Sequence, residues 1–283
     1  MDVGVVTRSF PELTNAQAAE LIASEGFRWI ELCFSQTDSN YWVYNGRSDL
    51  TGLSDAKSRA IVSEYRNRGL EIPSLGVFTN LLEPDDAQWK ENLAYFDRLM
   101  EIAATNGIPV VATECGFIPG QRGINADAFE SRFERLCSAL HWLTERASQY
   151  HLDVALEACV LDVVPSAKRA ADVIQQVGSE HLKVLLDPAN FIANNTEEEM
   201  FAHLSQYVAY FHGKDREVNA AKGCAVGDGH INWPKFIELY QKRTPGVPFI
   251  LEYVTRDNFC EIRDRVLAID REVATLMHRE TAF

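Results

Sequence analysis

Short apolar runs rich in β-branched residues alternate with longer amphipathic segments along almost the whole chain. The predicted strands are Val3–Val6, Trp29–Cys33, Glu71–Val77, Val110–Glu114, Val154–Glu157, Val184–Asp187, Val208–His212 and Phe249–Glu252. A repeated alternation of strand and helix is typical of a parallel sheet whose connecting helices cover it. This pattern constrains the fold more than any other feature of the sequence.

The segments between the strands have helical periodicity. In one of them, Phe129, Phe133, Leu136 and Leu140 recur at steps of three and four residues, which gives a helix one buried face. The predicted helices are Ala16–Ser24, Asp55–Arg68, Trp89–Ala104, Ala126–Ser148, Ala167–Gln176, Trp233–Gln241 and Phe259–Met277, with a shorter and less regular segment at Thr196–His203.

Capping signals agree with these boundaries. Glycines occupy the expected C-terminal position of four helices: Gly26, Gly69, Gly107 and Gly178. Serines occupy the expected N-cap position of two others: Ser54 and Ser166. No linker rich in proline, glycine or serine divides the chain, so we expect one domain over residues 1–283, a single (β/α)8 TIM barrel. An open doubly wound sheet is the alternative, but no G-x-G-x-x-G motif follows an early strand.

Charge and cysteine usage restrict the partners and the compartment. The formal net charge of −14 argues against a nucleic-acid partner, because it repels phosphates. No apolar run approaches the roughly 20 residues that span a bilayer, and the N-terminal MDVGVVTRSF lacks the pattern of a signal peptide. The six cysteines are scattered singly, as in proteins with reduced thiols. We therefore expect a cytoplasmic protein with no membrane partner; a homo-oligomer stays open.

Potential metal ligands end the last four predicted strands. VALE ends in Glu157, VLLD in Asp187, YFH in His212 and FILE in Glu252. The C-terminal ends of all barrel strands surround one mouth, so these four residues become neighbours there. One acidic residue at a strand end is commonly solvated or caps a helix, but three converging carboxylates need a cation. The oxygen-rich set favours Mn²⁺, Mg²⁺ or Co²⁺ over a structural zinc ion.

Several motifs make the chain resemble the xylose isomerase-like TIM-barrel family of sugar isomerases and epimerases. The family includes ketose 3-epimerases, hydroxypyruvate isomerase, inosose dehydratase and endonuclease IV. The motifs are ALEA, LLDPAN, FHGKDR, GDGHINW and ILEY. In epimerase and isomerase members, the residues matching Glu157, Asp187, His212 and Glu252 bind one metal. The resemblance implies one divalent ion, foremost Mn²⁺, with Mg²⁺, Co²⁺ or Zn²⁺ as alternatives.

The resemblance also implies a reaction. The two matching glutamates exchange protons with the substrate in those relatives, so Glu157 and Glu252 are the predicted catalytic pair. A metal-stabilised enediolate next to a carbonyl accounts for isomerisation or epimerisation of a sugar or sugar-acid. One position departs from the pattern: ketose epimerases commonly have a substrate-binding histidine where this chain has Asn190. Asparagine can hydrogen-bond a hydroxyl or cap a turn, but it cannot titrate near neutral pH.

Other polar residues at strand ends are candidates for substrate binding. Lys214 and Arg216 follow His212 and either hold a carboxylate or phosphate, neutralise the site or are solvated. Arg8 could meet an anionic group and Asn80 a hydroxyl, while Glu114 could touch the substrate or pair with Arg8. Barrels also need polar residues at their strand ends for structural reasons, so both interpretations stay open for each residue.

Three rival functions remain at this stage. An inosose dehydratase-like lyase would use the same metal but expel water, and Asn190 favours this rival slightly. An endonuclease IV-like nuclease needs additional histidine ligands and a DNA-binding face, which the negative charge disfavours. A non-catalytic sugar-binding barrel would not need the complete ligand quartet.

Overall fold

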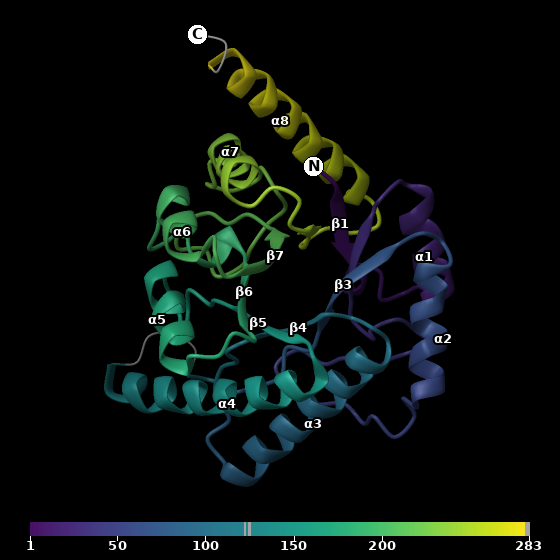
Figure 1. Ribbon diagram of the computed structural model, residues 1–283, viewed down its shortest axis with the longest axis vertical. Coiled ribbons are helices and arrows are strands. Elements are labelled where there is room, and N and C mark those ends of the chain that lie inside the picture. Colours follow the sequence, from purple (N-terminus) through teal and green to yellow (C-terminus); the bar gives the residue numbers. More distant parts are fainter. Residues whose placement is uncertain (122, 124–125, 281–283) are drawn as a thin grey trace.

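Eight parallel strands close into a barrel in chain order, as Figure 1 shows. The computed structural model describes residues 1–121, 123 and 126–280. The strands are β1 Val3–Val6, β2 Trp29–Leu32, β3 Glu71–Gly76, β4 Val110–Glu114, β5 Asp153–Glu157, β6 Leu182–Leu186, β7 Val208–Gly213 and β8 Phe249–Leu251. Parallel pairing of β1 with β8, for example Val5 opposite Leu251, closes the ring. The predicted (β/α)8 barrel is confirmed.

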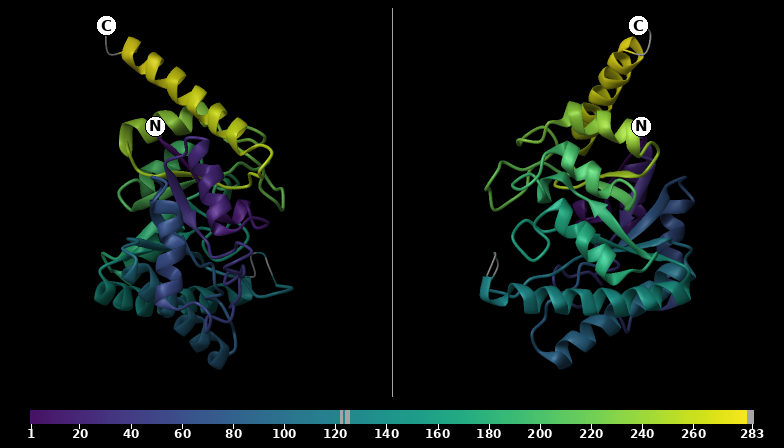
Figure 2. Two further views of the ribbon diagram at one scale, coloured as in Figure 1. Left: turned by 90° about the vertical axis from the view of Figure 1, so that its right-hand side faces the viewer. Right: turned by 60° about the vertical axis from the view of Figure 1, so that its left-hand side comes forward.

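Helices alternate with the strands and surround the barrel (Figures 1 and 2). They are α1 Asn15–Ser24, α2 Asp55–Arg66, α3 Asp86–Thr105, α4 Phe129–Tyr150, α5 Ala167–Val177, α6 Glu197–Leu204, α7 Trp233–Arg243 and α8 Phe259–Glu280. Short 3-10 turns lie at η1 Thr7–Ser9, η2 Ala126–Ala128 and η3 Pro188–Asn190. The C-terminal part of α8 extends away from the barrel in every view. None of the described helices is both long enough and apolar enough to cross a membrane.

Helix caps explain where the predicted boundaries hold and where they shift. Helix α3 begins at Asp86, three residues before the predicted start, because the Asp85 side chain caps it by accepting from the Gln88 N–H at 2.9 Å. The less regular segment at Thr196–His203 is helix α6. Thr196 and Glu199 stabilise its first turn with a reciprocal capping box. The predicted helix at Ala126–Ser148 begins instead with the 3-10 turn η2 and continues as α4.

Two apolar layers hold the barrel together. The larger one lies between strands and helices; in α5, for example, Ala170, Val173, Ile174 and Val177 are buried on one face. The smaller layer lies inside the barrel and consists of Val6, Phe78, Ala112, Ala155, Leu185, Tyr210 and Ile250. Branched and aromatic side chains fill the barrel interior, as expected for a packed core rather than a pore.

Candidate metal centre

The four predicted ligands lie together at the C-terminal mouth of the barrel. Glu157 is the last residue of β5, Asp187 follows β6, His212 is the penultimate residue of β7 and Glu252 follows β8. Each offers one ligand atom, and these atoms lie within 4.8 Å of one another. All four side chains are buried. The strand ends thus bring together residues separated by almost a hundred positions in sequence, which is the prediction made from the four apolar runs.

Two buried atoms in this group lack a hydrogen-bond partner in the described part of the chain. They are His212 Nδ1 and Glu252 Oε2, which lie 3.5 Å apart. Glu157 Oε1 lies 3.4 Å from the same nitrogen. Glu252 Oε2 has the ammonium of Lys214 at 3.2 Å as an ion-pair partner, whereas a buried imidazole nitrogen left unsatisfied costs about 1–3 kcal/mol. A divalent cation held by that nitrogen and the carboxylate oxygens would remove this cost. The donor set therefore fits a metal ion.

Local structure orients the carboxylate of Asp187. The Asp187 Oδ1 atom accepts from the Ala189 N–H at 2.9 Å and caps η3, whose first position is Pro188. The amide of Asn190 donates to Asp187 Oδ2 and to Glu157 Oε1, both at 3.0 Å. Asn190 thus braces two of the predicted ligands as well as closing the turn, and its contact with substrate stays a prediction.

The ammonium group of Lys214 lies among the carboxylates of the four predicted ligands. Its Nζ lies 2.5 Å from Asp187 Oδ2, 3.2 Å from Glu252 Oε2 and 3.9 Å from Glu157 Oε1. Of the roles expected for Lys214, the geometry favours neutralisation of the site over a solvated position. Arg216 is also buried, but its guanidinium donates to the backbone carbonyls of Ala189 at 2.9 Å and Ala220 at 2.7 Å. Arg216 therefore holds the loop after β7 against η3.

Arg8 lies on the other side of the quartet. Its guanidinium forms ion pairs with Glu252 Oε1 and, at 2.7 Å, with Glu31 Oε1. Among the described residues Arg8 pairs with these two glutamates and not with Glu114, whose Oε2 accepts from the Tyr44 hydroxyl at 2.8 Å. Arg8 lies in η1, and its guanidinium thus connects Glu31 of β2 with Glu252 after β8.

Asn80 has a local structural contact. Its Oδ1 accepts from the Leu82 N–H at 3.1 Å, and its backbone carbonyl accepts from Asn92 at 2.6 Å. The predicted hydroxyl-binding roles of Asn80 and Glu114 stay predictions.

Sequence reasoning missed one central residue, Glu31 of β2. Its carboxylate is fully buried and accepts from His212 Nε2 at 2.9 Å and from the Tyr210 hydroxyl at 2.5 Å. The available signal was a single glutamate inside the apolar run WIEL. A buried charge in the middle of a strand needs a partner, and here it has Arg8 and the imidazole of His212.

The surroundings of the two predicted catalytic glutamates differ. Burial raises the pKa of Glu157 to about 8, and the nearby Lys214 opposes this only in part. Burial also acts on Glu252, but the positive charges of Lys214 and Arg8 hold its pKa well below the ordinary value. Burial would lower the pKa of His212, yet the charges of Glu31 and Glu252 raise it to about 10. Without a metal ion, therefore, Glu157 holds a proton at neutral pH and Glu252 does not.

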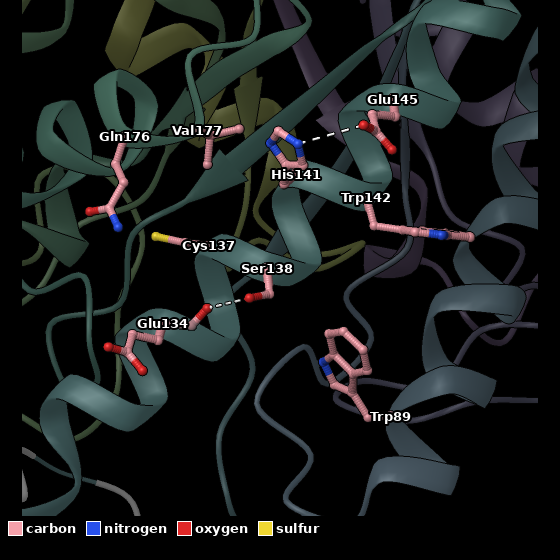
Figure 3. A pocket seen from close by; sticks show the side chains of 9 residues that line it. All are labelled: Trp89, Glu134, Cys137, Ser138, His141, Trp142, Glu145, Gln176 and Val177. Carbon is pink, nitrogen blue, oxygen red and sulfur yellow. Dashed lines mark hydrogen bonds and ion pairs between the residues drawn. The ribbon is translucent and has the colours of Figure 1, made fainter.

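A surface hollow of about 660 Å³ lies away from this centre, between α3, α4 and α5 (Figure 3). Its lining includes the indole rings of Trp89 and Trp142 and the side chains of Glu134 and His141. None of the four clustered ligands lines it. The chemistry assigned to the strand ends thus belongs to the barrel mouth rather than to this outer face.

Comparison with known proteins gives one family match. The sequence model described as xylose isomerase-like TIM barrel matches residues 19–277. No curated protein sequence matches the chain.

Solved structures of similar fold cover nearly the whole chain. A D-psicose 3-epimerase from Clostridium cellulolyticum H10, solved with D-tagatose, has a TM-score of 0.75 and 16% identity, covering 96% of this chain and 99% of its own. The IolI protein with a bound zinc atom has a TM-score of 0.73 and 16% identity, covering 97% and 96%. A Mycobacterium smegmatis barrel in complex with magnesium has a TM-score of 0.69 and 18% identity, covering 96% and 97%. At these identities the likeness shows the fold.

Proposed function

Because the chain belongs to the xylose isomerase-like TIM-barrel family, we propose that it is a divalent-metal-dependent isomerase or epimerase of a sugar. The observation that carries this proposal is the buried four-residue cluster, in which His212 Nδ1 has no hydrogen-bond partner among the described residues. Mn²⁺ is the ion we propose first, given the three carboxylates. Proteins of similar fold solved with zinc and with magnesium support the proposal of a divalent ion.

The two glutamates have different proposed roles in the transfer of a proton from and to carbon. A bound ion would polarise a substrate carbonyl and so acidify the neighbouring C–H. Glu252, whose pKa is held low by Lys214 and Arg8, is suited to accept a proton from carbon. Glu157, the other glutamate of the quartet, is the group proposed to return a proton to carbon. Its raised pKa belongs to the metal-free centre, since a bound ion would hold Glu157 as a carboxylate.

The cations of the mouth favour an uncharged substrate. Lys214 and Arg8 are engaged by carboxylates of the site, and Arg216 by backbone carbonyls. A carboxylate or phosphate on the substrate would have to compete for these contacts. We therefore propose a ketose before a sugar-acid or a sugar phosphate, and the epimerase solved with D-tagatose supports that order.

A lyase that expels water remains the second candidate. Asn190 donates to Glu157 and Asp187 from a position where ketose epimerases commonly carry a histidine, which separates this centre from a typical epimerase. A multi-metal nuclease is disfavoured, since the ligand cluster found among the described residues contains a single histidine.

The test is turnover by metal-loaded protein on a panel of ketoses, keto-acids and inososes in D₂O. Solvent deuterium at the carbon next to the carbonyl with unchanged heavy-atom composition supports isomerisation, whereas loss of water supports the lyase. On a confirmed substrate, we expect Glu157→Gln and Glu252→Gln each to lower kcat by at least about 100-fold. Glu134→Gln on the outer face of α4 is the matched control. Near wild-type turnover in both site variants would contradict the acid–base assignment.

A further inference from the structure

The carboxylate of Glu31 is enclosed by other side chains inside the barrel. The side chain is completely buried although it carries a charge. The neighbouring strand leaves room for it at Gly76, where a Cβ atom would lie 2.7 Å from Glu31 Oε1. A side chain at position 76 would displace the carboxylate. The buried position of Glu31 therefore requires glycine at position 76.

One oxygen of the Glu31 carboxylate determines which ring nitrogen of His212 carries a proton. Glu31 Oε2 lies 2.9 Å from His212 Nε2. When the imidazole loses one proton to become a metal ligand, the ring nitrogen that faces the carboxylate keeps its proton, which leaves the lone pair on the other nitrogen. That other nitrogen, His212 Nδ1, faces Glu157 Oε1 at 3.4 Å and Glu252 Oε2 at 3.5 Å. Glu31 therefore selects the tautomer that presents Nδ1 to the ligand cluster.

The other oxygen acts on a second ligand through Arg8. Glu31 Oε1 accepts from Arg8 at 2.7 Å, and the second guanidinium nitrogen of Arg8 pairs with Glu252 Oε1. This contact leaves Glu252 Oε2 directed at the cluster. The guanidinium is held in place by aromatic rings, with its carbon 4.9 Å from the centre of the Phe78 ring and 5.7 Å from that of Trp42.

We propose that Glu31 is a positioning residue that orders two of the four metal ligands, His212 directly and Glu252 through Arg8. The inference rests on the proposed function, because it takes the quartet to hold a divalent ion. Carboxylates that hydrogen-bond the second nitrogen of a ligating histidine orient the ring and raise its basicity, and their loss costs about 10- to 100-fold in metal affinity. A buried glutamate with a purely structural role would affect folding but not the tautomer.

The first test uses the wild-type protein, so it does not depend on a variant that folds. Long-range ¹H–¹⁵N NMR of the histidine rings, recorded with Zn²⁺ or Mg²⁺ bound, should show His212 with a protonated Nε2 and a metal-bound Nδ1. A metal-bound Nε2, or a proton on Nδ1 in the loaded protein, would overturn the proposal. Absence of metal binding by the wild-type protein would instead refute the proposed function.

The second test compares variants by calorimetric titration with Mn²⁺. In Glu31→Gln the amide can donate to His212 Nε2, which moves the ring proton to Nδ1, and we expect affinity to fall by about 10- to 100-fold. In Arg8→Met we expect a smaller loss of affinity, with the wild-type His212 tautomer retained in the NMR spectrum. Tyr210→Phe is the matched control, because it also removes one hydrogen bond to Glu31 but leaves the imidazole contact. Wild-type affinity together with the wild-type tautomer in Glu31→Gln would refute the positioning role.

Discussion

At the residue scale, the positive charge of Lys214 lies among three closely spaced carboxyl groups of the candidate metal centre. The ammonium of Lys214 contacts Asp187 and Glu252 and lies near Glu157. Burying several carboxylates without a counter-charge is unfavourable, so Lys214 stabilises the centre before any ion binds.

Replacing this lysine should therefore destabilise the metal-free protein. We expect Lys214→Met to lower the free energy of unfolding by about 3–5 kcal/mol, the usual cost of removing one partner of a buried ion pair. Thermal unfolding in EDTA measures this loss, and added Mn²⁺ should recover more stability in the variant than in the wild type. Lys235→Met is a suitable control, because Lys235 pairs with Glu198 and Glu238 at the surface, where such pairs contribute about 0–1 kcal/mol. Equal losses in the two variants would contradict this account of Lys214.

The raised pKa of Glu157 predicts how metal affinity depends on pH. In the metal-free protein the Glu157 carboxyl holds its proton up to about pH 8, whereas a metal ligand must be a carboxylate. Protons therefore compete with the ion, and affinity should rise as pH increases toward about 8. Titration calorimetry with Mn²⁺ from about pH 6 to about pH 8 should show a gain from this proton that approaches roughly tenfold per pH unit at the lower end of the range, with proton release on binding. Affinity that does not change over this range would contradict the assignment.

At the element scale, the loop between β7 and α7 depends on one buried carboxylate. Asp215 accepts from the backbone N–H groups of Arg216 at 2.8 Å, Gly227 at 3.0 Å and Ile231 at 3.1 Å, and from the indole N–H of Trp233 at 2.7 Å. This loop follows the strand that carries His212, and Lys214 is its first residue. Its folding thus helps to place two residues of the centre.

Replacing Asp215 by a neutral residue should destabilise the protein through this loop. In Asp215→Asn one side-chain oxygen becomes a donor, so two of the four N–H groups lose their acceptor. Hydrogen bonds to a charged group contribute about 1.5–3 kcal/mol each, and we expect the variant to lose at least about 3 kcal/mol in denaturant unfolding. Asp228→Asn in the same loop removes only an exposed pair with Arg265 and should change stability by less than about 1 kcal/mol. A small effect at Asp215 would show that the loop does not rely on these bonds.

The arrangement of strands and turns explains which site residues the sequence could predict and which it could not. Apolar runs that end in Glu157, Asp187 and Glu252 are sufficient to predict that these carboxylates cluster, because parallel strands end at one mouth. The role of Glu31 could not be read from its run, since the barrel closure decides which strand residues point inward. The contacts of Arg8 were equally inaccessible, because a 3-10 turn directs that side chain toward β2 and β8 rather than β4.

At the scale of the whole molecule, the alternation of strands and helices was enough to predict the closed barrel, and the registers between neighbouring strands confirm it. No disulfide joins the six cysteines, all of which lie in the described part of the chain. Extension of one domain over all 283 residues, the cytoplasmic location, the lack of a nucleic-acid partner and the oligomeric state stay predictions.

The central claim is that Glu157, Asp187, His212 and Glu252 together hold one divalent ion. The most direct measurement is the metal content of the protein by plasma mass spectrometry after loading with Mn²⁺, Mg²⁺, Co²⁺ or Zn²⁺ and removal of loosely bound ions. We expect one ion per chain in the wild type and a marked loss in Asp187→Asn, with binding stabilising the wild-type fold by about 2.7 kcal/mol at a 100-fold excess over Kd. Wild-type protein that retains none of these ions, and whose stability none of them changes, would contradict the claim.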